Sequence, residues 1–432
     1  MCNITDMADR VGKHLQSSAL EIRSHQLGGF ADVEADLPDI RSTEGSDGRP
    51  STATDFLSLL GHWNPLPQDI TGKDQVWLLD NTAYKSAETD FWQAEFVAAV
   101  FDQNTGVELT KVVANIAEKV GVGKGDAAEA TIQERLMPFA RSTLPGRKVR
   151  VEFDQSKEIE LGPGGRNAIS NDTKVLPRHA GGHIVTSVAQ VPEGANGELQ
   201  MRTVYAEPKG WGIISGTSRS SVAGLTLTDT LIDIDDSIKI TRTSDPIGIL
   251  RSTFVSTPTP VSGMPELYAY IRKTITPAAP FFYLSASPYN LYPFLRKFLA
   301  EFYPHGTIIL RDASWTNLSG LLSTLTLGTQ AYKVSRMKKI NTWLPQRKMI
   351  CIGDSTQSDP EAYGQIYRTY PGWIRLIFIR KVTDIAEGKL EEKNEPSRFE
   401  KAFEGVPPDV WHVFESPEEC YKIIGDVVEQ ES

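Results

Sequence analysis

The sequence predicts an α/β protein in which the carboxyl-terminal half forms a parallel sheet with helices on both faces. After about residue 224, apolar runs of strand length alternate with segments of helical periodicity. These runs are apolar throughout rather than at alternate positions, which is typical of strands that are buried on both faces. Polar residues follow directly after several of the runs, as expected where such a sheet binds its ligand.

The first 55 residues are predicted to be a disordered tail. They are polar and rich in Gly, Ser and Thr, as in the segment "STEGSDGRPSTATD". Such a composition buries too little apolar surface to offset the entropy cost of ordering the chain. Ordered structure is expected to begin near "FLSLLGHW".

Residues 56–224 are predicted to form a smaller helical and β-rich domain. "DQVWLLDNTAY" (74–84) has the pattern of a strand and turn, whereas residues 90–102 and 107–122 carry apolar side chains at helical spacing. From residue 147 onward the period changes to that of strands, in "RKVRVEF", "KEIELG", "HIVTSVAQV" and "LQMRTVYA". The Gly-rich "LGPGGRN" favours a turn over a phosphate-binding loop, and "RHAGGH" favours a solvated turn over a zinc site.

Residues 225–432 are predicted to form the parallel-sheet domain. The predicted strands are "LTLTDTLID", "FFYLS", "TIIL", "MICIG" and "RLIFIR". The predicted helices between them include "YNLYPFLRKFLAEFY", "AYKVSRMKKINTWL" and "DPEAYGQIYRTY".

The composition indicates the cellular compartment of the protein and the kinds of partner it can bind. The three cysteines, Cys2, Cys351 and Cys420, are too few for a disulfide framework and favour a reducing compartment. No stretch approaches about 18 uninterrupted apolar residues and the amino terminus has no apolar signal core, so we expect a cytoplasmic protein without a transmembrane helix. The net charge of −10 argues against a general nucleic-acid binder.

Charge is distributed unevenly along the chain. Residues 290–350 hold nine Lys and Arg against two Asp and Glu, whereas residues 381–432 hold fourteen Asp and Glu against six Lys and Arg. This pattern fits either two differently solvated faces or a basic face near an anionic ligand.

Polar side chains collect after the predicted strands, whose carboxyl ends meet at one edge of the sheet. Like charges this close repel unless a positive group lies among them, and clustered carboxylates suit a hard cation such as Mg²⁺. Lys333, in the helix before the fourth run, adds a further positive charge. The collected residues are Asp233, Asp235 and Ser237 after the first run, Ser285 after the second, and Asp354 and Asp359 after the fourth.

Such a cluster can support phosphoryl transfer. An Asp carboxylate can attack phosphorus to form an aspartyl-phosphate. A second Asp two residues further on can protonate the leaving oxygen and then activate water. A hydroxyl and a lysine can hold the phosphoryl oxygens and oppose their charge.

"DIDDSI", "YLS", Lys333 and "IGDSTQSD" occur in the order of the four motifs of the haloacid dehalogenase-type phosphatase superfamily, which this chain resembles. "SDPIGILRSTF", "YLSASPYNLYPFLRKFL" and "VWLLDNTAY" are similar to one branch, the fungal actin-patch-associated phosphatidate phosphatases, whose catalytic domain is related to that of the lipins. The resemblance covers roughly residues 74–432. It implies a Rossmann-like, haloacid dehalogenase-like fold and Mg²⁺-dependent hydrolysis of phosphatidate to diacylglycerol and phosphate through an aspartyl-phosphate.

The resemblance also implies a role for each collected residue. Asp233 would be the nucleophile and a metal ligand, and Asp235 the general acid and base, with its backbone carbonyl on the metal. Ser237, Ser285 and Lys333 would bind the substrate phosphate, and Asp354 and Asp359 would complete the metal shell, Asp359 directly or through water. The chain has Ser237 where the family usually has Thr, and "ASPY" at 286–289 where it usually has Asn-Ser-Pro-Trp.

Several nearby residues have simpler structural interpretations. Asp236 is predicted to form a turn, Lys338 and Lys339 to be solvated helix charges, and Ser287 to cap the following helix, because a Ser before a Pro-led helix is a good N-cap. Fewer than fifty residues separate the first two motifs, which predicts an open site without a large lid.

Two alternatives to phosphatidate hydrolysis remain: a phosphatase for another phosphomonoester, such as a phosphoprotein or soluble metabolite, and a non-catalytic lipid-binding or scaffold module. The presence of both Asp233 and Asp235 favours an enzyme. The implied partners are a phosphatidate-containing membrane surface, bound peripherally, and actin-patch or endocytic proteins, with a cytoplasmic location at membranes or cortical actin patches. We hypothesise that Arg296, Lys297, Lys338 and Lys339 bind the anionic bilayer.

Overall fold

The computed structural model describes residues 17–37, 74–206 and 228–431, apart from internal gaps in the second and third ranges. The gaps lie at 87, 90, 103–108, 123–125, 142–143, 145, 154–156, 163, 165–168, 176–183, 190–197, 276–279, 305, 312–320 and 384–390. "FLSLLGHW", "RHAGGH" and most of "LGPGGRN" therefore lie outside the described residues.

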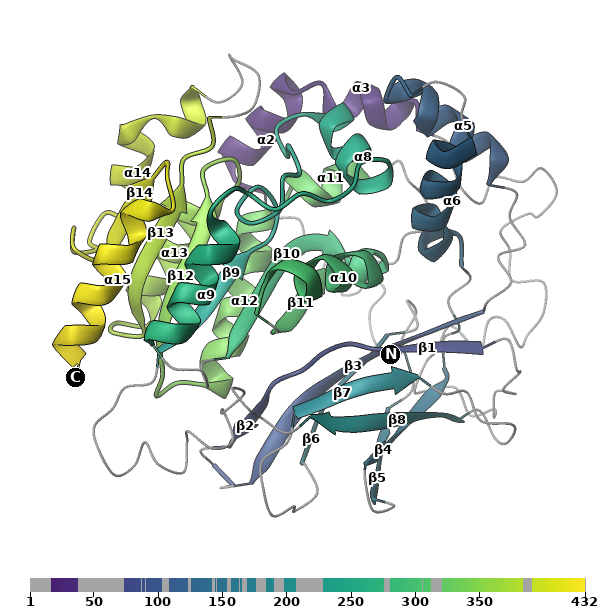
Figure 1. Ribbon diagram of the computed structural model, residues 1–432, viewed down its shortest axis with the longest axis horizontal. Helices are drawn as coiled ribbons and strands as arrows, with labels where there is room; N and C mark the ends of the chain where they lie inside the picture. Colours follow the sequence, from purple (N-terminus) through teal and green to yellow (C-terminus); the bar gives the residue numbers. More distant parts are fainter. Residues whose placement is uncertain are drawn as a thin grey trace, which may run out of the picture.

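A six-stranded sheet in which all neighbouring strands are parallel organises the carboxyl-terminal half (Figure 1). The strand order is β11-β10-β9-β12-β13-β14. This confirms the predicted mixed α/β architecture with a parallel sheet. The strands are β9 (Thr228–Asp233), β10 (Phe281–Pro288), β11 (Thr307–Arg311), β12 (Lys348–Asp354), β13 (Ile374–Arg380) and β14 (Trp411–Phe414).

The strands are apolar throughout because both faces of this sheet are covered. In β12, Ile350 and Ile352 belong to one buried cluster, whereas Met349 and Cys351 belong to another. Successive side chains of a strand point to opposite faces, so two separate cores require a continuous apolar run rather than an alternating one.

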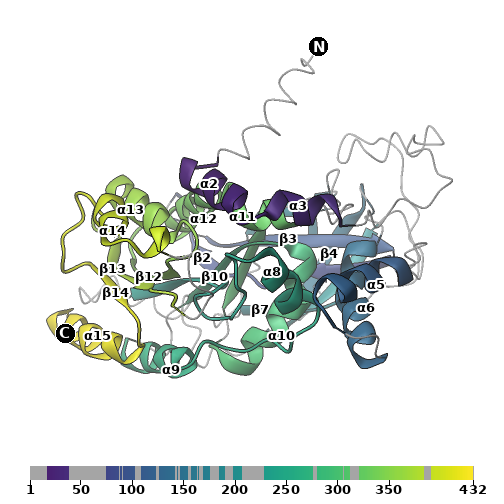
Figure 2. The same cartoon turned by 90° about the horizontal axis from the view of Figure 1, so that it is seen from above.

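The helices form a layer on each face, which Figure 2 shows from above. The first cluster is covered by α8 (Pro246–Phe254), α9 (Met264–Thr274), α10 (Tyr292–Phe302), α11 (Leu321–Thr326) and α15 (Glu418–Glu431). The second is covered by α12 (Thr329–Trp343), α13 (Asp359–Thr369) and α14 (Pro396–Ala402). Two short 3₁₀ helices, η3 (Tyr289–Leu291) and η5 (Glu392–Asn394), lie at the ends of connections. Within the described residues, no helix is long and apolar enough to cross a membrane.

Two smaller sheets precede the parallel sheet in the chain and lie together beside it (Figure 1). Phe96 and Val100 of one sheet pack in a shared buried cluster with Val149 and Val151 of the other. The first sheet contains β1 (Asp74–Leu78), β2 (Ala83–Lys85), β3 (Trp92–Asp102) and β6 (Ile169–Val175), and the second contains β4 (Lys148–Phe153), β5 (Lys157–Leu161), β7 (Ile184–Ala189) and β8 (Glu198–Ala206). The predicted strands at 74–84 and after residue 147 are confirmed.

The helix predicted at 90–102 is wrong, because Trp92–Asp102 form the long strand β3. The strand pairs with β2 and β1 in turn along one edge and with β6 along the other. Phe96 faces the second small sheet, whereas Phe101 faces the core that leads to the parallel sheet. A strand that is buried on both faces has a dense apolar sequence, which helical spacing also fits by chance.

The helix predicted at 107–122 is confirmed as α5 (Thr110–Lys119), and it is followed by α6 (Asp126–Ala140), which the sequence analysis did not identify. Both helices share the core of the parallel-sheet half rather than that of the two small sheets. Phe139 of α6 makes an edge contact with Phe254 of α8, at a ring-centroid distance of 5.7 Å.

The predicted disordered tail is wrong for residues 17–37. They form α2 (Ala19–Leu27) and α3 (Phe30–Ala35), which lie across the top of the parallel-sheet half in Figure 1. Ser18 and Glu21 make a reciprocal capping box at the start of α2. Phe30 and Leu37 are buried in the core of the parallel-sheet half, so apolar contacts contribute to docking this polar segment.

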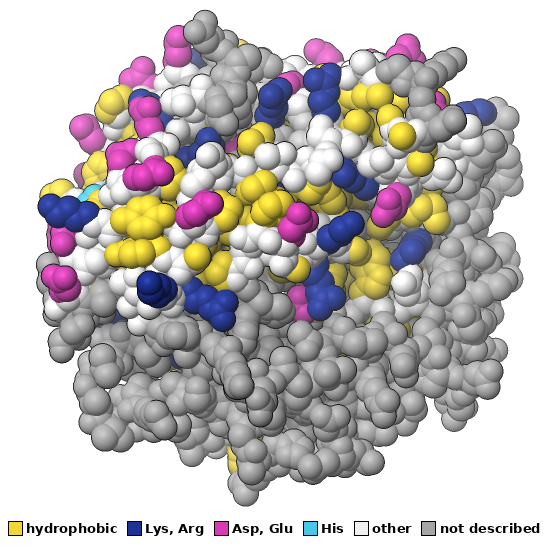
Figure 3. All heavy atoms as spheres, viewed as in Figure 1, with side chains coloured by type: hydrophobic (Ala, Val, Ile, Leu, Met, Phe, Trp, Pro, Cys, Tyr) yellow, Lys and Arg dark blue, Asp and Glu magenta, His cyan; other side chains and the backbone are white. Residues whose placement is uncertain are grey.

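Two of the basic residues assigned to membrane binding contact the first small sheet instead. The Arg296 guanidinium bonds to both carboxylate oxygens of Asp80, with its Nε 3.1 Å from Oδ2. Lys339 forms an ion pair with Glu95 of β3, so its interpretation as a solvated helix charge is wrong. Lys297 and Lys338 are exposed. On the face seen in Figure 3, basic and acidic side chains are interspersed rather than separated.

Replacing Phe96 with Ala should test the β3 assignment. Phe96 is fully buried between the two small sheets, so its truncation should lower the free energy of unfolding by about 3–5 kcal/mol, as measured by chemical denaturation. Phe91 is the matched control, since it is 43% exposed and Phe91→Ala should cost much less. The helical pattern places Phe91, Phe96 and Val100 on one face, so equal losses for the two Phe variants would contradict the strand.

Candidate functional site

Two of the predicted acidic site residues lie where the strand order of the parallel sheet reverses. β9 ends at Asp233 and β12, its neighbour, ends at Asp354. From β9 the chain continues to β10 and β11 on one side of the sheet, and then returns to β12 on the other side. Connections that diverge in this way leave a crevice at the carboxyl ends of the two strands, where open α/β sheets bind ligands.

Three buried carboxylates and one lysine meet at this crevice. Carboxylate oxygens of Asp233, Asp354 and Asp359 lie within 4.8 Å of one another. The Lys333 ammonium lies 2.6 Å from Asp233 Oδ1 and 2.5 Å from Asp359 Oδ1. All four side chains are inaccessible or nearly so, which strengthens every charge interaction among them.

Asp359 reaches this cluster because Gly353 has no side chain. A Cβ atom on Gly353 would lie 2.6 Å from the Asp359 carboxyl carbon. The carboxylate instead folds back against the end of β12, where its Oδ2 accepts the Asp354 N–H at 3.2 Å. The Gly and the two Asp of the "GDSTQSD" segment are thus one structural unit.

The cluster contains three acidic groups and only one basic group. Burial raises the pKa of the Asp233 carboxyl well above its usual range, and the neighbouring Asp359 raises it further, while Lys333 opposes the shift. Burial and Asp359 likewise raise the pKa of Asp354. Burial disfavours the Lys333 ammonium, but Asp233 and Asp359 outweigh this and raise its pKa above the usual value. Lys333 therefore stays charged among carboxyls that repel one another.

Asp235 lies beside this cluster within a set of hydroxyl groups. Its Oδ2 accepts hydrogen bonds from Ser285 Oγ at 2.6 Å and Ser287 Oγ at 3.3 Å, and its Oδ1 accepts one from Thr241 Oγ1 at 2.9 Å. The predicted helix-capping role of Ser287 is wrong, because the hydroxyl points to Asp235 and the residue before the 3₁₀ turn is Pro288. The β10 strand extends far enough to present both serines to Asp235.

Asp236 forms a turn, as predicted, and orders the segment after β9. Its backbone is left-handed, with φ of 57°, a conformation that Asp tolerates better than most residues. Its carboxylate accepts the backbone N–H groups of Thr241, Arg242 and Thr243 and the Thr243 hydroxyl. Four donors on one buried carboxylate fix the loop that carries Asp235.

Ser237 lies at the junction of the two strands. Its hydroxyl is 3.3 Å from Asp354 Oδ2 and 3.5 Å from Asp233 Oδ2, so it bridges the two carboxylates. All the sequence-predicted site residues therefore come together at one edge of the sheet. The Asp235 carboxylate is the exception within the predicted metal set, since it lies with the hydroxyls and not with the other three carboxylates.

Four residues that support the site were not identified from the sequence. The Thr356 N–H and hydroxyl both donate to Asp354 Oδ1, and the Thr243 and Thr356 hydroxyls are 2.8 Å apart. Arg398 donates to the carbonyl groups of Ser355 at 2.5 Å and Gln357 at 2.6 Å. Lys393 donates to the Thr356 carbonyl at 2.5 Å. Thr356 lies within "GDSTQSD", two residues after Asp354, but the contacts of Thr243, Lys393 and Arg398 join residues 37 to 113 positions apart, which no local pattern marks.

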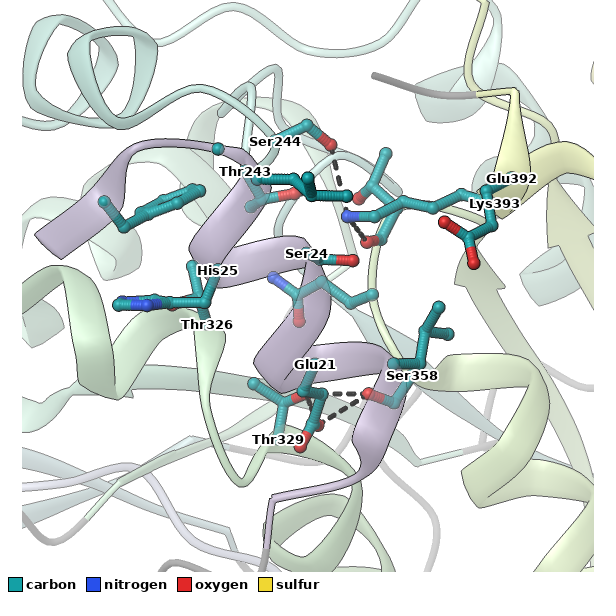
Figure 4. Close-up of a pocket in the computed structure, with 16 residues that line it drawn as sticks. Glu21, Ser24, His25, Thr243, Ser244, Thr326, Thr329, Ser358, Glu392 and Lys393 are labelled. Atoms are coloured by element: carbon teal, nitrogen blue, oxygen red, sulfur yellow. Dashed lines mark hydrogen bonds between the residues drawn. The ribbon is translucent and has the colours of Figure 1, made fainter. Parts of the chain in front are cut away.

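A cavity of about 290 Å³ adjoins these loops and is closed on one side by α2 (Figure 4). None of the predicted catalytic residues is among those that line it, so it lies beside the site. Lys393 reaches the cavity from η5, and Glu21 and His25 reach it from α2. Its lining combines hydroxyl groups, one lysine and the apolar side chains Leu20, Leu27 and Phe30.

The site-bearing segment matches a known family. Residues 229–381 match the family model described as the catalytic domain of phosphatidate phosphatase APP1. The chain is 29% identical over 200 residues to "Phosphatidate phosphatase APP1" of Saccharomyces cerevisiae, an alignment that covers 44% of this chain and 30% of the yeast protein. It is 28% identical over 167 residues to an uncharacterized protein of Schizosaccharomyces pombe, covering 38% of this chain and 27% of the relative.

These matches confirm the resemblance seen in the sequence motifs. The matched range contains Asp233, Ser285, Lys333, Asp354 and Asp359, and it excludes α2, the two small sheets and Lys393. The aligned residues span less than a third of the length of either relative.

Because of Lys393, the free energy of unfolding should depend on pH in the alkaline range. Burial and the nearby Arg398 lower its pKa to about 8, below the unfolded value of about 10.4. Between these two values the unfolded chain binds more protons, so the free energy of unfolding should rise with pH by at most about 1.4 kcal/mol per unit relative to Lys393→Met. Denaturation at pH 7, 8.5 and 10 measures this difference. Lys297→Met, at an exposed lysine, is the control, and a pH-independent difference for Lys393→Met would contradict the assignment.

Proposed function

We propose that this chain is a Mg²⁺-dependent phosphatidate phosphatase that hydrolyses phosphatidate to diacylglycerol and phosphate through an aspartyl-phosphate. Residues 225–432 would form its Rossmann-like, haloacid dehalogenase-like catalytic domain. One observation carries the proposal: Asp233, Lys333, Asp354 and Asp359, from three separate segments of the matched range, converge in one buried cluster.

The cluster fits a divalent cation. If its three carboxylates are ionised, Lys333 alone leaves a surplus of negative charge in a buried position, which is costly without a further cation. Oxygen donors with no His or Cys in the group suit a hard ion such as Mg²⁺. Asp233, Asp354, the backbone carbonyl of Asp235 and Asp359, directly or through water, would hold it. Bound there, Mg²⁺ would oppose the negative charge of the phosphoryl oxygens.

Asp233 would act as the nucleophile. A carboxylate oxygen attacks phosphorus, the bond from phosphorus to the alcohol oxygen breaks, and the phosphoryl group stays on Asp233 as an acyl phosphate. Water then attacks phosphorus, which releases phosphate and restores the carboxylate. Lys333, already 2.6 Å from Asp233, is placed to bind phosphoryl oxygens during both steps.

Asp235 would move the protons. It would protonate the departing alcohol oxygen in the first step and take a proton from water in the second. The hydrogen bonds from Ser287 and Thr241 would hold its carboxyl group in a fixed orientation during both steps. The Ser285 hydroxyl would turn to the substrate phosphate when that group is bound.

We also propose a cytoplasmic location, and the proposed substrate requires a peripheral contact with a phosphatidate-containing membrane. Of the four basic residues first assigned to this contact, Lys297 and Lys338 are exposed, whereas Arg296 and Lys339 are held by Asp80 and Glu95. We therefore retain only Lys297 and Lys338 as candidates for bilayer binding.

Phosphate release from a panel of substrates tests the proposed substrate class. The panel comprises phosphatidate in mixed micelles, lysophosphatidate, p-nitrophenyl phosphate and a phosphopeptide, each with Mg²⁺ or with EDTA. Hydrolysis of phosphatidate with the highest kcat/KM, abolished by EDTA, would support the proposal. A preference for a soluble ester or for the phosphopeptide would support the second phosphatase hypothesis, and binding of lipid without turnover would support the non-catalytic one.

Asp233→Asn should abolish turnover while the fold persists. The amide retains the shape of the side chain but removes the attacking charge and a metal ligand, so phosphate release should fall by several orders of magnitude. Circular dichroism and thermal unfolding serve as the control for folding. Near-wild-type turnover by the folded variant would exclude Asp233 as the nucleophile.

Asp235→Asn should separate proton transfer from metal binding. Loss of a general acid and base typically lowers the rate about 10²–10⁴-fold, whereas Mg²⁺ affinity should be largely preserved because the backbone carbonyl is unchanged. Turnover measured across a Mg²⁺ titration distinguishes the two effects. If the rate at saturating Mg²⁺ were normal and only the affinity fell, Asp235 would be a ligand rather than the acid and base.

A further inference from the structure

Helix α2 lies outside the matched catalytic segment, yet its Glu21 contacts two helices that carry site residues. Apart from the Ser18 N–H, which it accepts in the capping box of α2, the partners of the Glu21 carboxylate lie about 300 residues further along the chain, and Glu21 is only 5% exposed (Figure 4). It accepts hydrogen bonds from the Gly328 N–H at 3.1 Å, the Gln330 N–H at 2.9 Å and the Thr329 hydroxyl at 2.6 Å. It also accepts the Ser358 hydroxyl at 2.7 Å.

These contacts replace a cap that α12 does not have. The residue before α12 is Gly328, which has no side chain to accept the first N–H groups of the helix. A helix start leaves such N–H groups unsatisfied and favours negative charge beside them. The hydrogen bonds outweigh the burial of the group and lower the pKa of Glu21, so the carboxylate is charged at neutral pH.

The same carboxylate joins α12 to α13. Ser358 precedes α13 and makes no capping bond of its own, because its hydroxyl is directed to Glu21 and to the Thr329 hydroxyl, 3.0 Å away. Lys333 lies one turn into α12, on the same face as Thr329, and Asp359 is the first residue of α13. The starts of the two helices are thus tied together next to the ion pair of Lys333 with Asp359.

We propose that Glu21 is a positioning residue of the catalytic site, which fixes α12 against α13 so that Lys333 meets Asp233 and Asp359. The residues that provide the chemistry lie in the matched range, but their alignment depends on an amino-terminal helix that lies outside it. The test of this inference by enzyme activity rests on the proposed function. A second test, by ligand binding, does not depend on that function.

Glu34 provides a matched control within the same docked segment. Its carboxylate also accepts a backbone N–H and a hydroxyl, both from Ser323 of α11, with the hydroxyl at 2.5 Å. None of the proposed catalytic residues lies on α11. Loss of Glu34 therefore weakens docking of residues 17–37 without acting on the junction of α12 and α13.

The experiment compares Glu21→Ala, Glu21→Gln and Glu34→Ala in the full-length chain. For p-nitrophenyl phosphate and phosphatidate at saturating Mg²⁺, Glu21→Ala should lower kcat by about 10–100-fold, since a displacement of about 1 Å can cost 10²-fold. Glu34→Ala should retain kcat within about threefold of the wild-type value, even if its melting temperature falls as much as that of Glu21→Ala. Glu21→Gln keeps one acceptor oxygen and should recover part of the loss, and it also serves if the Ala variant does not fold.

Calorimetric binding of inorganic phosphate in the presence of Mg²⁺ supplies the second readout. Glu21→Ala should weaken this binding about tenfold, and Glu34→Ala should not. If the wild-type chain hydrolyses no tested ester, the proposed function fails, and the binding data alone still decide the role of Glu21. Equal losses of phosphate binding in the Glu21 and Glu34 variants, or no loss in either, would overturn the positioning role.

Discussion

The contact of the Lys333 ammonium with Asp233 and Asp359 is the interaction on which the site depends. It places one positive charge among three buried carboxyl groups that would otherwise repel one another. Burial raises the cost of each unpaired charge, so the geometry of this group is sharply constrained. The surrounding structure is arranged to bring three distant segments to one point and to hold them there.

Two features of the parallel sheet meet that requirement. The order of strands reverses between β9 and β12, so that Asp233 and Asp354 end side by side. The missing side chain of Gly353 lets Asp359 fold back onto the end of β12. Hydrogen bonds to Asp236 and Asp354 then order the two loops, and the hydroxyl pair of Thr243 and Thr356 connects them.

Parts of the chain outside the matched range complete this arrangement. Lys393 and Arg398 contact the loop after β12 from the carboxyl-terminal side. Glu21 supplies the start of α12 with an acceptor from the amino-terminal side, and Asp80 and Glu95, from the segment of the first small sheet, form ion pairs with Arg296 and Lys339. The segment that carries the candidate site residues is therefore held in place by contacts with residues outside the matched range.

The sequence by itself determined the parallel sheet apart from its last strand, β14, the helices α10, α12 and α13, and the candidate residues of the site. Continuous apolar runs require a sheet covered on both faces, and the residues that follow such runs must meet at its carboxyl edge. For this reason Asp233, Asp235, Ser237, Ser285, Asp354 and Asp359 could be named before the structure was described, whereas Lys333, which lies in a helix before a strand, was named through the resemblance of the motifs.

Only the tertiary structure decided the rest, because it depends on contacts between residues far apart in the chain. Residues 92–102 form a strand because β1, β2 and β6 pair with them, although their spacing also fits a helix. Ser287 turns to Asp235 instead of capping a helix, and Lys339 pairs with Glu95 instead of facing solvent. The polar segment 17–37 is ordered because Glu21 satisfies donors about 300 residues away, which no local composition can indicate.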